Sequence, residues 1–296
     1  VIVSDIMEDI RSMLLTNAVD IESAIQVFNE EWDLIIDTFE KKDYSQLEKQ
    51  LIQTAKQIRK IPLKQSPEAV PTISLVGQIF VRRDELSRQY LTERLAEKGF
   101  ATICSPIAEW ALYSDYLVDK GLVEYTMSIR EKLSFILKKM YMARYTRRIK
   151  SILAGSGLVH AEPLNIRSII NNASPHISLN LAGEAILTVG SALTEIASHT
   201  CGVIAIGPFG CMPNRLAEAI LNEAMNHEGK LATDPNNNKL RSVLTNLDDL
   251  PFLAIESDGS PFPQLITAKL ESFCLRAERL HNKMIPKLNV SNLERE

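Results

Sequence analysis

The chain has 296 residues with 45% hydrophobic content, and 33 Lys and Arg against 37 Asp and Glu give a net charge of -4. Abundant apolar residues and a low net charge exclude a disordered chain. A dedicated nucleic-acid binder usually carries a basic excess, which this composition lacks. A nucleic acid is therefore not an expected partner. A membrane is not expected either, because no apolar run approaches the roughly 18–20 residues of a membrane span.

The four cysteines are too few for a disulfide scaffold, and no two of them form a Cys-x-x-Cys pair. No basic stretch followed by an apolar run opens the sequence, as it would in a secretory signal. A reducing, cytoplasmic compartment is therefore expected. The sequence opens on Val1 rather than Met, already in a helix-like pattern, so we expect a fragment of a longer polypeptide.

Residues 1–65 are predicted to form a helical N-terminal segment, because helical spacing of apolar residues continues without Gly or Pro up to Pro62. Asp20 and Ser45 each stand just before an apolar periodic stretch and are predicted to be N-caps. Two prolines within residues 65–71 then interrupt both helix and sheet and predict a linker to a second domain.

Residues 70–285 are predicted to form a Rossmann-like α/β domain. Four short runs of branched and apolar residues are typical of strands, at 73–77, 100–104, 202–207 and 252–255. Helical patterns separate them, and the first helix closes at Gly99, a typical stop residue. Strand, helix and strand within about 30 residues indicate a parallel βαβ unit. The predicted fold class is α/β, an open parallel sheet of about four strands, in which 203–207 and 252–255 are neighbours.

Large helical additions are predicted at the N-terminus and around 122–155, the latter as an insertion. The insertion contains a basic stretch at 138–150 with Tyr141 and Tyr145 interleaved. This stretch is interpreted as a solvated helix face, with binding of nucleic acid or CoA phosphates as the alternative.

Two later helices are predicted together with the side chains that they bury. The helix after the third strand is predicted to direct Leu216, Ala219 and Ile220 inward, at helical spacing. The last helix, at about 264–281, is predicted to hold Cys274 on its apolar stripe.

The carboxyl ends of the predicted strands bring several chemically active residues to one edge. In open parallel sheets, ligands bind in the crevice outside those strand ends. The candidate residues at this edge are Arg82, Arg83, Asp84, Cys104, Cys211, Glu256 and Asp258. Two cysteines, two arginines and three acids are therefore expected to face one crevice.

Cys211 is the most informative of these residues. It lies between the third strand and a helix whose first turn contains Pro213, a residue favoured at that position. Free backbone N–H groups and the helix dipole would stabilise a thiolate there, which suits metal ligation or nucleophilic attack. The alternative is a small residue that fills a tight turn. A second helix opens at Gly183, where Asn180 or Glu184 is either a cap or part of the site.

The other cysteines lie in different contexts. Cys201 starts the third strand, roughly 20 Å from Cys211 at the usual rise per strand residue. Cys274 is predicted to lie in the core, and Cys104 belongs either to the core or to the site. At most two cysteines reach the crevice, whereas an iron–sulfur cluster usually takes three or four. These residues alone are therefore not expected to hold a cluster.

Four stretches of the sequence resemble one protein family, and they lie at 77–84, 183–190, 207–213 and 250–259. Together they resemble the C-terminal part of the CoA-substrate-specific enzyme activases, which is similar to the iron–sulfur subunits of 2-hydroxyacyl-CoA dehydratases. The resemblance covers residues 70–280, and its most specific piece is Pro-Phe-Gly-Cys-Met-Pro around Cys211.

The resemblance implies a four-iron four-sulfur cluster held between Rossmann-like domains. It also implies ATP-driven transfer of a low-potential electron to an acyl-CoA dehydratase or reductase component. Among the family's cluster cysteines only Cys211 carries over, and it is the expected metal ligand. The expected surroundings of the cofactor are Cys104, Arg82, Arg83, Glu184, Glu256 and Asp258. The other cluster ligands and the ATP-hydrolysing module are expected upstream of residue 1, so these upstream domains are expected partners.

Two further functions stay open. The first is a thiol enzyme with Cys211 as nucleophile and His176 as base, and the second is an interaction domain without chemistry. The sequence lacks Gly-x-x-x-x-Gly-Lys-[Ser/Thr], Gly-x-Gly-x-x-Gly, His-Glu-x-x-His and Gly-x-Ser-x-Gly, which removes the commonest nucleotide, zinc-protease and serine-hydrolase classes.

Overall fold

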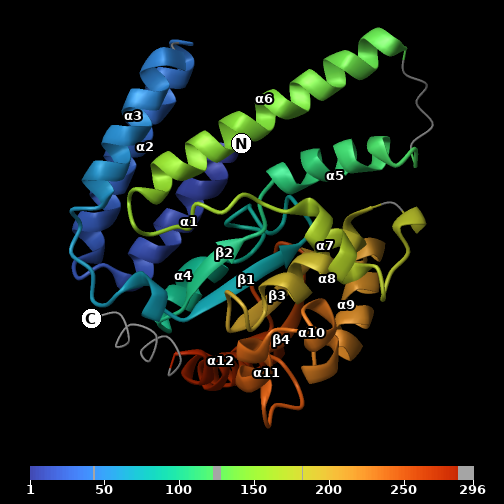
Figure 1. The fold of residues 1–296 in the computed structure, drawn as a ribbon. Helices are drawn as coiled ribbons and strands as arrows, with labels where there is room; N and C mark the ends of the chain where they lie inside the picture. Colours follow the sequence, from blue (N-terminus) through green and yellow to red (C-terminus); the bar gives the residue numbers. More distant parts are fainter. Residues whose placement is uncertain (43, 123–127, 182, 286–296) are drawn as a thin grey trace. The chain divides into compact units, whose positions relative to one another are not determined.

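The computed structural model describes residues 1–42, 44–122, 128–181 and 183–285 (Figure 1). The chain divides into two compact units, and each unit is built from two separate segments. The first unit combines residues 1–68 with 106–164, and the second combines 69–105 with the part that follows 164. The predicted helical insertion therefore belongs to the same unit as the N-terminal helices, a grouping that the linear pattern does not reveal.

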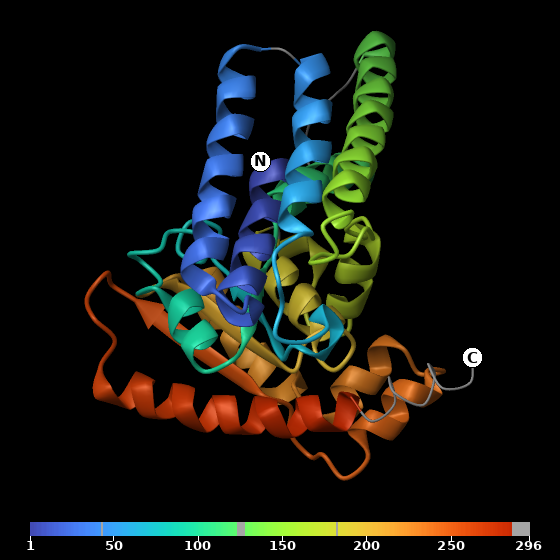
Figure 2. The same ribbon diagram turned by 90° about the vertical axis from the view of Figure 1, so that its left-hand side faces the viewer.

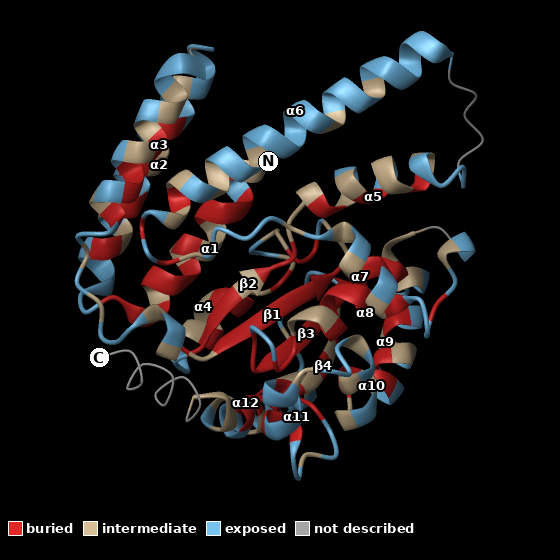
Figure 3. Cartoon of the chain, in the orientation of Figure 1, coloured by how far each residue is buried: buried red, intermediate tan, exposed pale blue. Residues whose placement is uncertain are grey.

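The second unit is built on a parallel sheet. Its strands are β1 (Thr72–Gly77), β2 (Ala101–Cys104), β3 (Gly202–Pro208) and β4 (Phe252–Ser257). They pair in the order β2-β1-β3-β4, and each neighbouring pair is parallel. The predicted α/β fold class, the Rossmann-like parallel sheet and the pairing of the last two strands are confirmed. Figure 3 shows β1 and β3 almost wholly buried, as expected for strands covered on both faces.

The strand order defines where the sheet can form a crevice. The chain leaves β1 for β2 on one side and returns to β3 on the other side, so the topology reverses between β1 and β3. Open α/β sheets bind ligands outside the carboxyl ends of the strands at such a switch point. Gly77 and Ile206 are partners at this end of the two strands.

Helices complete the second unit. They are α4 (Leu91–Glu97), α7 (Ile166–Ala173), α8 (Glu184–Glu195), α9 (Met212–Ala224), α10 (His227–Thr233), α11 (Asn238–Leu244) and α12 (Gln264–Met284). As predicted, Cys274 lies on the buried stripe of α12 and Gly99 follows α4 with a left-handed φ of 85°.

The prediction for the buried face of α9 is wrong. Leu216 is 38% exposed, and the helix instead buries Asn214, Ala217 and Leu221. The reason is local: the turn at Gly210 and Pro213 starts the helix with Asn214 packed against the end of β3, which sets the direction of the whole stripe. Leu216 is thereby left on the side of the crevice.

The first unit is helical. Its helices are α1 (Ile2–Asn17), α2 (Ile21–Glu40), α3 (Tyr44–Ile58), α5 (Ala108–Asp119) and α6 (Ile129–Ala154), seen from the side in Figure 2. Asp20 caps α2, as predicted, by accepting a hydrogen bond from Ser23 N at 3.1 Å. The predicted cap Ser45 is wrong, because α3 begins one residue earlier. No helix in the described ranges combines the length and the apolar character that crossing a membrane requires.

One buried carboxylate joins the two segments of the first unit. The Asp5 oxygens accept hydrogen bonds from the backbone N–H groups of Ile107 at 3.1 Å and Ala108 at 3.2 Å. The first turn of a helix leaves such N–H groups without partners inside the helix. Asp5 of α1 therefore caps α5 over a separation of about a hundred residues.

Candidate functional site

Cys211 lies at the switch-point edge of the second unit. It is the N-cap residue of α9, directly beyond β3, and Pro213 occupies the first turn of the helix. Gly210 makes the preceding turn possible, because its φ of 73° is strained for other residues. The side chain of Cys211 is partly exposed. The structure thus places this thiol where the sequence predicts it, beside a helix N-terminus.

The other three cysteines are buried. Cys104 donates its thiol hydrogen to the carbonyl of Arg82 at 3.4 Å, and Cys201 donates to the carbonyl of Thr72 at 3.2 Å. Burial raises the pKa of Cys201 to about 12, so it stays a neutral thiol at physiological pH. Burial also raises the pKa of Cys274. Only Cys211 combines exposure with a place at the crevice.

The two arginines after β1 bind backbone carbonyls. Arg82 is 2% exposed and donates to the carbonyls of Ser105, at 3.1 Å, and of Gly77. Arg83 donates from Nη2 to the carbonyls of Cys104, at 3.2 Å, and of Ser105, at 3.0 Å. Both side chains therefore brace the end of β2 against the loop after β1, and Arg82 does not line an open crevice.

Two glutamates hold the loops that surround Cys211. Glu184, the first residue of α8, accepts a hydrogen bond from Ile79 N at 2.6 Å and so ties this helix to the loop after β1. Glu256 accepts from Gly210 N at 3.4 Å and pairs with Arg215 at 3.4 Å. The turn that carries Cys211 is thus held from β4 and from α9 itself.

The remaining predicted acids, Asp258 and Asp84, accept backbone hydrogen bonds within turns. Asp258 accepts from Ser260 N at 2.9 Å, and this backbone hydrogen bond holds the pKa of its carboxyl below the ordinary value. Asp84 accepts from Ser87 N at 2.7 Å, and hydrogen bonds from Ser87 lower its pKa as well. Neither carboxylate contacts Cys211 among the described residues.

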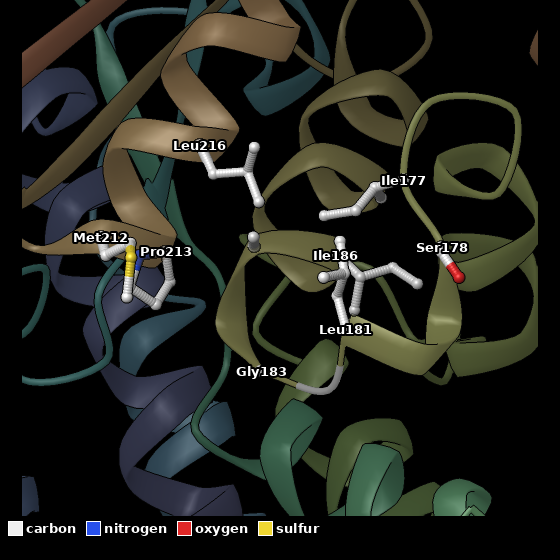
Figure 4. A pocket seen from close by; sticks show the side chains of 9 residues that line it. Ile177, Ser178, Leu181, Gly183, Ile186, Met212, Pro213 and Leu216 are labelled. Atoms are coloured by element: carbon white, nitrogen blue, oxygen red, sulfur yellow. The ribbon is translucent and has the colours of Figure 1, made fainter.

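An apolar cavity of about 230 Å³ opens beside the start of α9 (Figure 4). Its lining residues are Ile177, Ser178, Leu181, Gly183, Ala185, Ile186, Met212, Pro213 and Leu216. The starts of α8 and α9 both contribute to it, so two helix N-termini meet at this cavity. The sequence pattern did not reveal this cavity, because it predicted that Leu216 faces the core.

Large apolar side chains also flank Cys211 in the sequence. Phe209 is 77% exposed and Met212 is 80% exposed. These two side chains flank Cys211 and give the turn an apolar surface on both sides of the thiol in the sequence. The Phe-Gly-Cys-Met run in a turn is the signal from which these two exposed apolar side chains could have been predicted.

Asn214 is a second residue that sequence reasoning missed. It is 3% exposed, and neither its Oδ1 nor its Nδ2 atom has a hydrogen-bond partner in the described part of the chain. Its carboxamide carbon lies 2.6 Å from the place of a Cβ atom on Gly207, so the amide fills the space that this glycine leaves. A buried polar group without partners costs about 1–3 kcal/mol.

Replacing Asn214 by leucine is therefore expected to raise the free energy of unfolding by about 1 kcal/mol, because leucine fills a similar volume without unpaired polar atoms. Urea unfolding of Asn214→Leu measures the effect. The matched control is Asn237→Leu, which removes the cap of α11 and its 2.9 Å bond from Leu240 N and should lose about 1 kcal/mol. A loss of stability in Asn214→Leu equal to that of the control would contradict the prediction.

His176 and a complete metal site are not supported by the geometry. His176 is exposed in the turn after α7, and in the described ranges no hydrogen bond joins its ring to Cys211. Nor do these ranges contain a group of three or more His, Cys, Asp or Glu residues arranged to hold a metal ion. Among the cysteines of the described ranges, Cys211 is the one whose thiol is not buried.

No protein-family model, no curated protein and no solved structure matches this chain. The class that the structure defines is an open parallel α/β fold of Rossmann-like type, with a partly exposed cysteine at the helix N-terminus beside its switch point.

Proposed function

We propose that the chain is the Cys211-bearing domain of a CoA-substrate-specific enzyme activase. In this proposal Cys211 is one ligand of a four-iron four-sulfur cluster that the domain shares with another polypeptide segment. The observation that supports it is the position of this thiol, at the switch point of a parallel sheet and at the N-cap of α9. Unpaired N–H groups at a helix N-terminus favour the negative charge of a thiolate and of cluster sulfide.

The donor set fits one ligand position of such a cluster. Clusters are normally held by three or four thiolates, and the other cysteines of this chain are buried. The missing thiolates would come from upstream domains of the same polypeptide, which are then the first partners of this domain. When bound, the cluster would supply a one-electron carrier. The electron would pass to an acyl-CoA dehydratase or reductase component in the cytoplasm, with ATP hydrolysis assigned to another module.

The chain's own residues would prepare this ligand. Glu256 holds the turn that carries Cys211, and Glu184 holds the neighbouring loop after β1. Phe209 and Met212 would exclude water from the thiolate once a partner segment covers the crevice. Solvent exposure and hydrogen bonds to sulfur set the reduction potential of a cluster. The apolar side chains of Phe209 and Met212 therefore suit a low-potential carrier.

The test is the iron and sulfide content of the natural full-length protein, purified without oxygen. Cys211→Ser is expected to lower the bound iron at least about tenfold and to remove the visible cluster absorption, because a ligand is lost. Cys104→Ala and Cys274→Ala are the matched controls and should keep iron at the wild-type level. Iron-free wild-type protein, or unchanged iron in Cys211→Ser, would rule the proposal out.

A thiol enzyme is the second candidate, because the helix N-terminus that holds Cys211 lies beside an apolar cavity of about 230 Å³. Iron-free protein in which iodoacetamide modifies Cys211 much faster than the three buried cysteines would support this candidate. Iron-free protein with an unreactive Cys211 would favour an interaction domain without chemistry.

A further inference from the structure

Helix α6 of the first unit has almost no covered face. It has 26 residues, and only Leu153 near its C-terminal end is buried. Figure 3 shows the helix exposed along nearly its whole length. In folded proteins most of the stability of a helix comes from packing an apolar face, so a long helix without such packing is marginal in water. Its exposed face is therefore a surface that another molecule can stabilise.

The N-terminal half of α6 carries an apolar stripe. Six large side chains recur three or four residues apart and are between 53% and 88% exposed: Ile129, Leu133, Ile136, Leu137, Met140 and Tyr141. Residues at this spacing share one face of a helix. A contiguous apolar stripe on an exposed surface marks an interaction site.

The charges of α6 and α2 are opposite. The sequence of α6 holds eight Lys and Arg and one acid, Glu131, in a chain whose net charge is -4. The sequence of α2 holds six acids and no Lys or Arg. Leu34, Ile36 and Phe39 of α2 are also exposed. Each helix therefore exposes apolar side chains among charges of mainly one sign. These charges are positive on α6 and negative on α2, so the two helices are complementary.

Within one copy, α3 separates α2 from α6, so their opposite charges do not face each other. α3 packs against both of them, and Figure 2 shows α3 standing between the two. The outer faces of α2 and α6 are therefore both available to a second molecule.

We propose that α6 of one copy docks on α2 of a second copy, in a twofold dimer that forms both pairs at once. A twofold interface is self-complementary, which matches a unit that carries both faces. Each α6 is about 39 Å long and about 10 Å wide, so two pairs cover about 800 Å² per partner, the area that specific interfaces bury.

A membrane surface fits α6 less well. Helices that lie in a membrane interface separate a basic face from an apolar face. In α6 the basic residues interrupt the apolar stripe, because Arg130 lies one heptad before Leu137 and Arg144 lies one heptad after it. Acidic side chains placed among apolar ones, as on α2, match that arrangement.

Sedimentation velocity of the protein tests the dimer. A dimer is expected at micromolar concentration and low salt, with weaker association at high salt, because exposed charges are screened. Arg130→Glu with Arg144→Glu on α6 should weaken dimerisation at least about tenfold, and so should Asp33→Lys with Glu40→Lys on α2. Mixing the two double variants should restore a one-to-one dimer, because the reversed charges complement each other in one pair and the wild-type charges complement each other in the second pair.

The control reverses two exposed charges outside the proposed interface, Lys269→Glu with Arg279→Glu on α12, and should dimerise like the wild type. Circular dichroism of each variant shows that the helices are kept. A wild-type monomer throughout this range would overturn the proposal. So would double variants that dimerise normally, or a mixture that stays monomeric. A monomer that binds anionic vesicles or nucleic acid would assign α6 to that partner instead.

Discussion

Replacing Gly77 by alanine is expected to destabilise the second unit by about 3 kcal/mol or more. This glycine ends β1 with a φ of 108°, and a Cβ atom there would lie 2.1 Å from the carbonyl oxygen of Ile206. Ile206 belongs to the central strand β3 and is the ladder partner of Gly77, so this carbonyl has no room to move away. Left-handed backbone costs about 1–2 kcal/mol and overpacking about 1–3 kcal/mol, and both apply here.

The matched control is Gly99→Ala. Gly99 has a φ of 85°, but a Cβ atom there meets nothing within 4 Å. Its replacement should lose only the conformational cost, about 1–2 kcal/mol. Urea unfolding of both variants measures the difference, which is due to the close approach of β1 and β3 at the switch point. Equal losses in the two variants would show that this approach does not exist in solution.

The stability of the protein is expected to rise with pH through Lys230. This residue of α10 is 1% exposed and donates from Nζ to the carbonyls of Leu193 at 2.7 Å and Thr194 at 2.9 Å, in the last turn of α8. Burial lowers its pKa to about 8, although Glu195 and Asp234 act in the opposite direction. The unfolded chain, with a lysine pKa of about 10.4, then binds more protons than the folded chain between these two values.

The free energy of unfolding should therefore increase by about 3 kcal/mol from about pH 8 to about pH 10.4, and below pH 8 the cost of the buried charge is present in full. Other groups also titrate in this range, so the measurement is the difference between the wild type and Lys230→Met in urea unfolding at several pH values. The control is Lys239→Met on the exposed side of α11. A difference that is independent of pH would refute the assignment to Lys230.

The strands were predictable because their physical pattern is strong. Val203 to Ile206 form an uninterrupted apolar run, which is typical of a strand covered on both faces, and the structure buries all four side chains. The division into units was not predictable, because it depends on contacts between distant segments. Asp5 shows why: a carboxylate in the first helix caps a helix that begins at Ala108, and no local pattern reports such a bond.

The candidate site was also predictable from the sequence only in part. Cys211 was predictable because a strand, a glycine turn and a proline in the next turn specify a helix N-terminus. The direction of Arg82 was not, because only the folded chain shows which carbonyls its guanidinium reaches. Asn214 was missed for a related reason. A polar residue in a first helical turn usually faces water, and only the missing side chain of Gly207 lets this one enter the interior.

The interleaving of the two units has a consequence for synthesis on the ribosome. Helix α1 emerges well before its partner α5, because the bond from Ile107 to Asp5 spans 102 residues that include the first two strands. At about 5–20 residues per second, α1 waits about 5–20 s for the start of α5, and its unit is complete only when Leu164 has been translated. β1 and β2 wait as well, until β3 is translated more than a hundred residues later. Truncation at any single point before Leu164 therefore leaves both units incomplete, so nascent chains of that length should engage chaperones.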